Sequence, residues 1–251
     1  MFLALLAIPA LAFAEGNGNN LGPPMRLHVD GYCLDSVTFD DSDGEPPITD
    51  AWVSTQDSPT DAQNNKALRV VIPGSTAECL YYVEAFTQKS TGLNVPVEKL
   101  RNLSFEFRNT DTFGGGAPRF SVITNDGDVA FADAAGCNNP LQVRPSWSRA
   151  DFTGRKALGC TITDGAGTPY SSDGTDSAWK NYADANPGES VTLVVMVIDA
   201  QAVPVSSGGT YTLYRIAIPN GNGAPAGTGT RATMFNNTNS KGYDCTSEAA
   251  C

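Results

Sequence analysis

Hydrophobic and polar residues alternate most regularly between residues 103 and 131, in the passage LSFEFRNTDTFGGGAPRFSVITNDGDVAF. A period of two residues is that of a β-strand with one buried and one outward face. The first strand of the passage places Leu103, Phe105 and Phe107 on the buried face, and Ser104, Glu106 and Arg108 on the outward face. Further along, Asp126-Gly127 predicts a tight hairpin turn, with Phe120 and Val122 of the preceding strand pointing into the core.

Short alternating or apolar runs separated by Gly, Asn and Asp predict about nine strands in all. Beyond the first passage they are MRLHVDGYCLDSVTF, ALRVVIP, CLYYVEAF, SWSRADFTG, SVTLVVMVIDA and GTYTLYRIAI. ALRVVIP and CLYYVEAF are read as two strands joined by a turn at Gly74-Ser75. SVTLVVMVIDA is too continuously apolar for a one-sided strand, so we expect it to be buried on both faces.

One helix is predicted, in the segment DSAWKNYADANPG. Asp176 or Ser177 would cap its N-terminus, and Pro187-Gly188 would end it. Trp179 and Tyr182 lie three residues apart and so share one face, and we expect the helix to cover the apolar strand that follows it.

Many short strands with Gly, Asn and Asp turns and a single helix predict an all-β fold, a jelly-roll β-sandwich with one short helix. We divide the chain into a signal peptide over residues 1–14, a flexible lead over 15–24, a β-sandwich domain over 25–220 and a flexible Gly/Asn/Thr-rich tail over 221–251.

The first residues, MFLALLAIPALAFA, are uncharged and end in Ala12-Phe13-Ala14. This apolar stretch is shorter than the ~20 residues that span a bilayer, so it predicts a signal peptide cleaved after Ala14 rather than a membrane anchor. We therefore expect a secreted, extracellular protein that does not insert into a membrane.

The six cysteines are even in number and show neither C-x-x-C nor Cys/His spacing, which fits disulfides formed outside the cytoplasm. We favour Cys137–Cys160 because each residue flanks a predicted strand, and Cys245–Cys251 as a small terminal loop. Cys33–Cys79 then follows by elimination, and Cys33–Cys245 is the alternative.

The net charge of −11 and the pI of about 4.4 exclude a basic footprint for nucleic acid or for an anionic membrane. One acidic loop contains Asp40, Asp41 and Asp43, whose oxygens are ligands that calcium prefers. The loop lacks the full EF-hand pattern, so a solvated turn is the favoured interpretation. We expect no other cofactor.

Histidine occurs once, as His28, and there is no G-x-S-x-G sequence to pair with it, which argues against a Ser-His-Asp or Cys-His mechanism. Glycoside hydrolysis needs only two carboxylates, and Glu84 and Glu106 both face away from the apolar side of their predicted strands. Cross-strand charge pairing explains these two residues equally well, so we expect no enzymatic activity.

From about residue 51 to 218, the order of the runs ALRVVI, LSFEFRN, PRFSVITNDG, SWSRADFTG and YTLYRIAI resembles the carbohydrate-binding-module and galactose-binding-like jelly rolls of secreted bacterial proteins. The resemblance implies a non-catalytic domain that binds carbohydrate or a cell-surface polymer. In those modules the closing strand often carries an aspartate beside a structural calcium; here Arg215 stands near that place.

The residues expected to bind a ligand are outward-facing residues on strands assumed to be neighbours, and aromatic rings near loops. They are Tyr82, Glu84, Glu106 and Arg108 as a shallow floor, and Trp52 and Trp147 as stacking platforms. A solvated charge ladder is the favoured interpretation of the floor residues, and core packing is the favoured interpretation of each tryptophan. Two alternatives remain open: a structural or adhesion protein with no small ligand, and a polysaccharide-degrading enzyme that uses a carboxylate pair.

Overall fold

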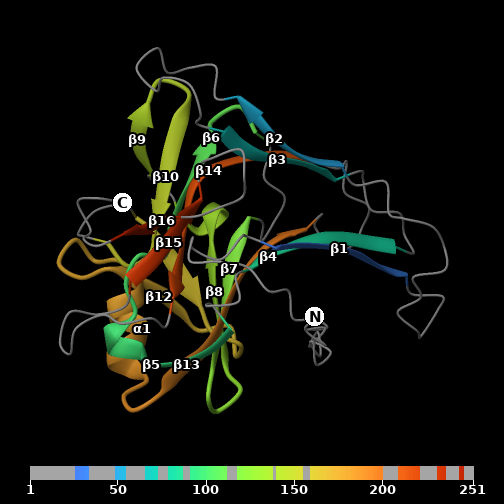
Figure 1. Ribbon diagram of the computed structural model, residues 1–251. Helices are drawn as coiled ribbons and strands as arrows, with labels where there is room; N and C mark the ends of the chain where they lie inside the picture. The colour runs from blue at the N-terminus through green and yellow to red at the C-terminus, as the bar shows by residue number, and fades with distance from the viewer. Residues whose placement is uncertain are drawn as a thin grey trace.

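The computed structural model describes residues 26–33, 49–54, 66–72, 79–86, 91–111, 118–137, 140–154, 159–199, 209–220, 231–235 and 243–245. Within these ranges the chain forms two antiparallel sheets and one α-helix (Figure 1). The predicted all-β class is confirmed. Residues 1–25, the acidic loop of Asp40, Asp41 and Asp43, and Cys251 lie outside the described ranges.

The first sheet, sheet I, contains eight strands around the long apolar strand β13. Its order is β1 (Arg26–Cys33), β4 (Cys79–Phe86), β13 (Ser190–Asp199), β7 (Arg119–Thr124), β8 (Val129–Asp133), β11 (Thr161–Thr163) and β12 (Pro169–Ser171), with β5 (Thr91–Pro96) also paired to β13. Residues from Val194 to Ile198 are all buried, which confirms that both faces of β13 are covered.

The second sheet, sheet II, also contains eight strands and is built around β14 (Gly209–Asn220). Its order is β16 (Tyr243–Cys245), β15 (Arg231–Phe235), β14, β6 (Ser104–Arg108), β10 (Trp147–Asp151) and β9 (Leu141–Arg144), with β3 (Lys66–Ile72) paired to β14 and β2 (Thr49–Ser54) to β3. In Figure 1 the β9–β10 hairpin reaches the top of the view, away from the helix.

One hydrophobic core contains side chains from both sheets. Sheet II contributes Phe105 and Phe107, and sheet I contributes Phe120 and Val122. These four side chains and Leu103 are at most 7% exposed, so the predicted inward residues of the 103–131 passage are confirmed. The β7–β8 hairpin is confirmed as well: the Gly127 N–H donates to Thr124 O at 3.2 Å, and Gly127 has the positive φ of 88° that the turn requires.

The helix α1 spans Ala178–Ala185, and the Ser177 hydroxyl accepts a hydrogen bond from Lys180 N at 3.2 Å, as expected of an N-cap. Trp179 and Tyr182 are both buried, and Trp179 Nε1 donates to Val97 O of the 3₁₀ turn η3 (Val97–Lys99) at 2.8 Å. The helix packs mainly on β11, β12 and η3 rather than covering β13, so that part of the prediction is wrong.

The placement of β3 and β4 and the structure of the C-terminal segment also differ from expectation. β3 and β4 follow one another in the chain, yet β3 belongs to sheet II and β4 to sheet I. Residues 221–251, expected to be a flexible tail, contain β15 and β16, which extend sheet II beyond β14.

The sulfur atoms of Cys137 and Cys160 lie 2.01 Å apart, as the favoured pairing requires. The bond joins the 3₁₀ turn η4 (Ala134–Gly136), which follows β8, to the start of β11, the strand paired with β8. The β1–β4 register makes Cys33 the direct cross-strand partner of Cys79, a placement that suits the second expected pairing. The pairing itself, like Cys245–Cys251, stays a prediction.

Candidate functional site

The expected binding floor is divided between the two sheets. Tyr82 and Glu84 lie on β4, which runs between β1 and β13 in sheet I, whereas Glu106 and Arg108 lie on β6, between β14 and β10 in sheet II. The assumption that β4 and β6 are neighbours is therefore wrong. Glu84 and Glu106 therefore do not form a pair of neighbouring carboxylates on one sheet. The cross-strand partners of Glu84 are His28 and Val197, not Glu106.

Glu106 is on the side of β6 that faces away from the core, but only 1% of it is exposed. Its cross-strand partners are Arg149 on β10 and Tyr214 on β14. Arg149 Nη2 donates to Ser104 Oγ at 3.0 Å and lies 3.5 Å from Asp151 Oδ2. Glu106 is therefore covered by its neighbours on this side of sheet II, and the expectation that it is solvent-facing is wrong.

Trp147 is fully buried on the same side of sheet II. Its ring packs edge to face against Tyr214, with centroids 5.8 Å apart, and the Arg108 guanidinium lies 5.5 Å from its centroid. A ring covered in this way offers no face for a sugar, so Trp147 is not a stacking platform. Trp52 lies on β2, opposite Leu68 of β3, and its side chain is outside the described part.

Asp111 follows β6 and accepts a hydrogen bond from the backbone N–H of Thr212 on β14 at 2.5 Å. Burial raises the pKa of the Asp111 carboxyl to about 6, although the Thr212 hydrogen bond and the nearby charges of Arg108 and Arg69 act to lower it. Asp111 thus joins the chain that follows β6 to the neighbouring strand β14.

The outer face of sheet I has a different character around β8. Burial alternates along this strand: Ala130 and Ala132 are fully buried, while Val129, Phe131 and Asp133 are partly exposed on the other side. A hollow of about 350 Å³ lies over this outer face. It is lined by Arg119 of β7, Phe131 and Asp133 of β8, Gly136 of η4, and Thr161 and Thr163 of β11. We call it the Phe131 hollow.

The Phe131 hollow combines one partly exposed ring with polar groups on three strands. Thr163 is the cross-strand partner of Phe131, and Asp133 is the partner of Arg119. The Arg119 guanidinium lies 5.8 Å from the Phe131 centroid. Such an arrangement can pack an apolar surface against the ring while hydroxyl, carboxylate and guanidinium groups hydrogen-bond around it.

None of the residues that line this hollow is among the ligand-binding residues expected from the sequence. One signal was available, because the period-two pattern of VAFAD places Phe131 on the same face as Asp133 and opposite Ala130 and Ala132. The contributions of Arg119 and Thr161 depend on which strands pair with β8, and no local pattern reports that.

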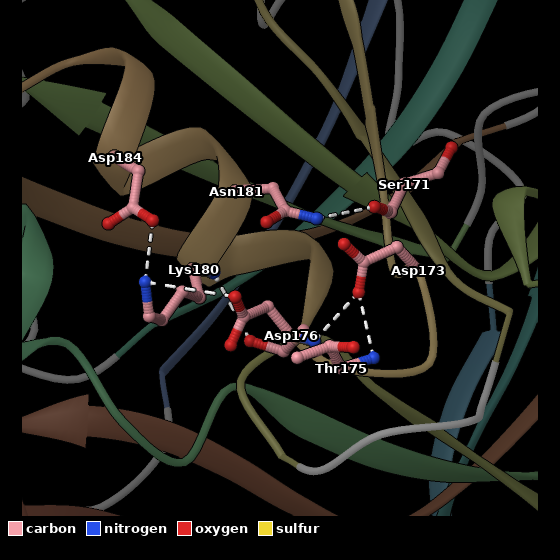
Figure 2. A network of polar contacts seen from close by, with 8 residues as sticks. Ser171, Asp173, Thr175, Asp176, Lys180, Asn181 and Asp184 are labelled. Carbon is pink, nitrogen blue, oxygen red and sulfur yellow. Dashed lines mark hydrogen bonds and ion pairs between the residues drawn. The ribbon is translucent and has the colours of Figure 1, made fainter.

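A second hollow, of about 360 Å³, lies beside α1. Its lining includes Glu98, Arg101, Thr153, Asp176, Lys180 and Asp184. Figure 2 shows Lys180 between Asp176 and Asp184, with its Nζ 3.9 Å from Asp176 Oδ2 and 2.5 Å from Asp184 Oδ2. Asp173 accepts from the backbone N–H groups of Thr175 and Asp176, both at 2.8 Å. Lys180 is thus already paired with the two aspartates of the lining, and the one ring in the wall, Trp179, is buried.

Comparison of the chain with protein-family models, with curated proteins and with solved structures found no match. Within the described ranges, no group of three or more His, Cys, Asp or Glu side chains is placed to hold a metal ion. No helix in the same ranges has the length and apolar content to cross a bilayer.

Proposed function

We propose that this protein is a secreted, non-catalytic jelly-roll domain that binds carbohydrate at the Phe131 hollow on the outer face of sheet I. Secretion is supported by the signal-peptide pattern of residues 1–14 and by the Cys137–Cys160 bond. The jelly-roll assignment is supported by two antiparallel sheets that share one core.

The observation that carries this proposal is the position of the Phe131 ring, partly exposed on a hollowed sheet face. Sugar rings have apolar faces that stack on aromatic rings, and their hydroxyls need hydrogen-bond partners around the edge. Thr161, Thr163, Arg119 and Asp133 provide donors and acceptors of this kind. A volume of about 350 Å³ is at the small end of the range for ligand sites, so it suits one or two sugar units of a chain.

A glycan array probed with the secreted protein tests the proposal. We expect binding to at least one class of polysaccharide or oligosaccharide, and we expect Phe131→Ala to abolish that binding because the stacking surface is removed. Phe131→Tyr keeps the ring and should retain binding.

Val129→Ala is the matched control, because Val129 is on the same face of β8 but does not line the hollow. It should bind like the parent protein. An array without hits, or hits that persist in Phe131→Ala, would overturn the proposal; the first result favours a structural or adhesion role, and the second places the site elsewhere.

A further inference from the structure

One wall of the Phe131 hollow is the short turn η4, and three features hold it in place. The Ala134 N–H donates to Pro118 O at 3.0 Å, and the Gly136 N–H donates to Asp133 Oδ1 at 3.3 Å. The Cys137–Cys160 disulfide then joins the end of η4 to the residue before β11. Gly136 and Thr161, which line the hollow, are the chain neighbours of the two cysteines.

We propose that Gly136 and the Cys137–Cys160 disulfide are positioning residues for carbohydrate: together they hold η4 against β11 and so set the width of the Phe131 hollow. This inference rests on the function proposed above. Neither the disulfide nor the glycine has to contact the ligand. Both act by setting the distance between η4 and β11, which form two walls of the hollow.

The close approach of η4 to β11 depends on Gly136 having no side chain. A Cβ at this position would lie 2.9 Å from the backbone oxygen of Thr161, closer than such atoms pack, and a backbone atom of a paired strand cannot simply rotate away. Alanine at position 136 would therefore push η4 away from β11 and widen the hollow, even with the disulfide intact.

The disulfide limits the distance between η4 and β11 as well, because it prevents the two segments from moving apart. Among the described residues, the hydrogen bonds that would remain without it include those from the Ala134 N–H to Pro118 O and from the Gly136 N–H to Asp133 Oδ1. If η4 is mobile in the free protein, binding has to order it, and the free energy of this ordering lowers the affinity for the ligand.

The test compares three variants for glycan affinity and for thermal stability, with binding measured well below each Tm. Gly136→Ala and the double variant Cys137→Ser/Cys160→Ser should each weaken glycan binding by about tenfold or more. Gly165→Ala is the control: its Cβ would also meet a close atom, Asp128 Oδ1 at 2.8 Å, but that atom ends a side chain and lies outside the hollow. Parent-like affinity in both Gly136→Ala and the double variant, while they remain folded, would overturn the inference.

Amide hydrogen exchange gives a second measurement that needs no ligand. In the double variant the amides of Ala134 and Ser172, which donate to Pro118 O and Cys160 O, should exchange faster, while amides of β13 keep their protection. Unchanged exchange at Ala134 and Ser172 would show that the disulfide does not brace this wall. If the parent protein binds no glycan, the proposed function fails, and the exchange result still decides whether the brace exists.

Discussion

The rings of Phe105 and Phe120 meet edge to face between the two sheets, with their centroids 5.5 Å apart. Phe105 comes from β6 of sheet II and Phe120 from β7 of sheet I, so this contact joins the sheets directly. Phe152 lies 6.2 Å from Phe105 and 6.3 Å from Phe120, which completes a cluster of three fully buried rings. The cluster stabilises the packing of the two sheets, since aromatic rings contribute both large buried area and specific edge-to-face contacts.

Phe105→Ala should lower the free energy of unfolding by about 3–5 kcal/mol, because the cavity it leaves is enclosed by both sheets. Urea denaturation monitored by tryptophan fluorescence would measure the loss. Phe131→Ala removes the same side chain from a partly exposed position on the outer face of sheet I and should cost clearly less. Equal losses from the two substitutions would mean that the Phe105 ring is not in the shared core.

Glu106→Ala should also be destabilising, by about 1–3 kcal/mol, because it removes a buried carboxylate and leaves the groups around it without that partner. Glu98→Ala is the control, since Glu98 is exposed on η3 and its loss should change stability by no more than about 0.5 kcal/mol. Chemical denaturation of both variants decides the point. A Glu106→Ala protein as stable as the parent would restore the original expectation of a solvated, outward glutamate.

Local features of the fold could be read from the sequence because their causes are local. Alternation identified the buried side of β6, Asp-Gly identified the β7–β8 turn, and the Ser177 cap with Trp179 and Tyr182 identified α1. Each of these depends on residues within one turn or one strand, where backbone geometry and side-chain period decide the outcome.

Strand partners could not be predicted from local patterns. For that reason the expected binding floor combined residues of strands that are not neighbours. Alternation tells which side of a strand is buried but not which strand lies beside it. It therefore cannot show that β4 and β6, whose outward residues are expected to form one floor, belong to different sheets. Alternation also does not distinguish an outward side chain that is exposed from one that neighbouring strands cover. Glu106 shows the difference, because the pairing of β6 with β10 and β14 surrounds it with neighbours. The Phe131 hollow joins β7, β8, η4 and β11, and so appears only once the pairing is known.

The capping hydroxyl of Ser177 gives a prediction for α1. Ser177→Ala removes the acceptor for Lys180 N and should cost about 1 kcal/mol, a typical value for a lost N-cap. Asp184→Ala breaks only the exposed ion pair with Lys180 and should cost no more than about 0.5 kcal/mol. Thermal unfolding of the two variants would measure both effects, and a larger loss from Asp184→Ala would contradict the expectation that the cap contributes more than the exposed ion pair.

The last prediction concerns the carboxyl of Asp111. Burial raises its pKa from the ordinary value of 3.8 to about 6. Below pH ~3.8 the carboxyl is protonated in both the folded and the unfolded chain. Between pH ~3.8 and ~6 the folded protein holds this proton more tightly than the unfolded chain, so stability falls as the pH rises through this window. Asp111→Asn keeps an oxygen that can accept from Thr212 N but carries no charge.

We therefore expect the free energy of unfolding of the parent, relative to that of Asp111→Asn, to decrease by about 1–2 kcal/mol between pH 4 and pH 7, a value reduced for the solvent-exposed part of the side chain. Urea denaturation at several pH values measures this difference. Asp173→Asn should behave in the opposite sense, because the backbone N–H groups of Asp176 and Thr175 lower the pKa of Asp173. The stability that Asp173 contributes is lost as the pH falls through its folded pKa. A flat difference curve for Asp111→Asn across this range would mean that the carboxyl is not desolvated beside Thr212.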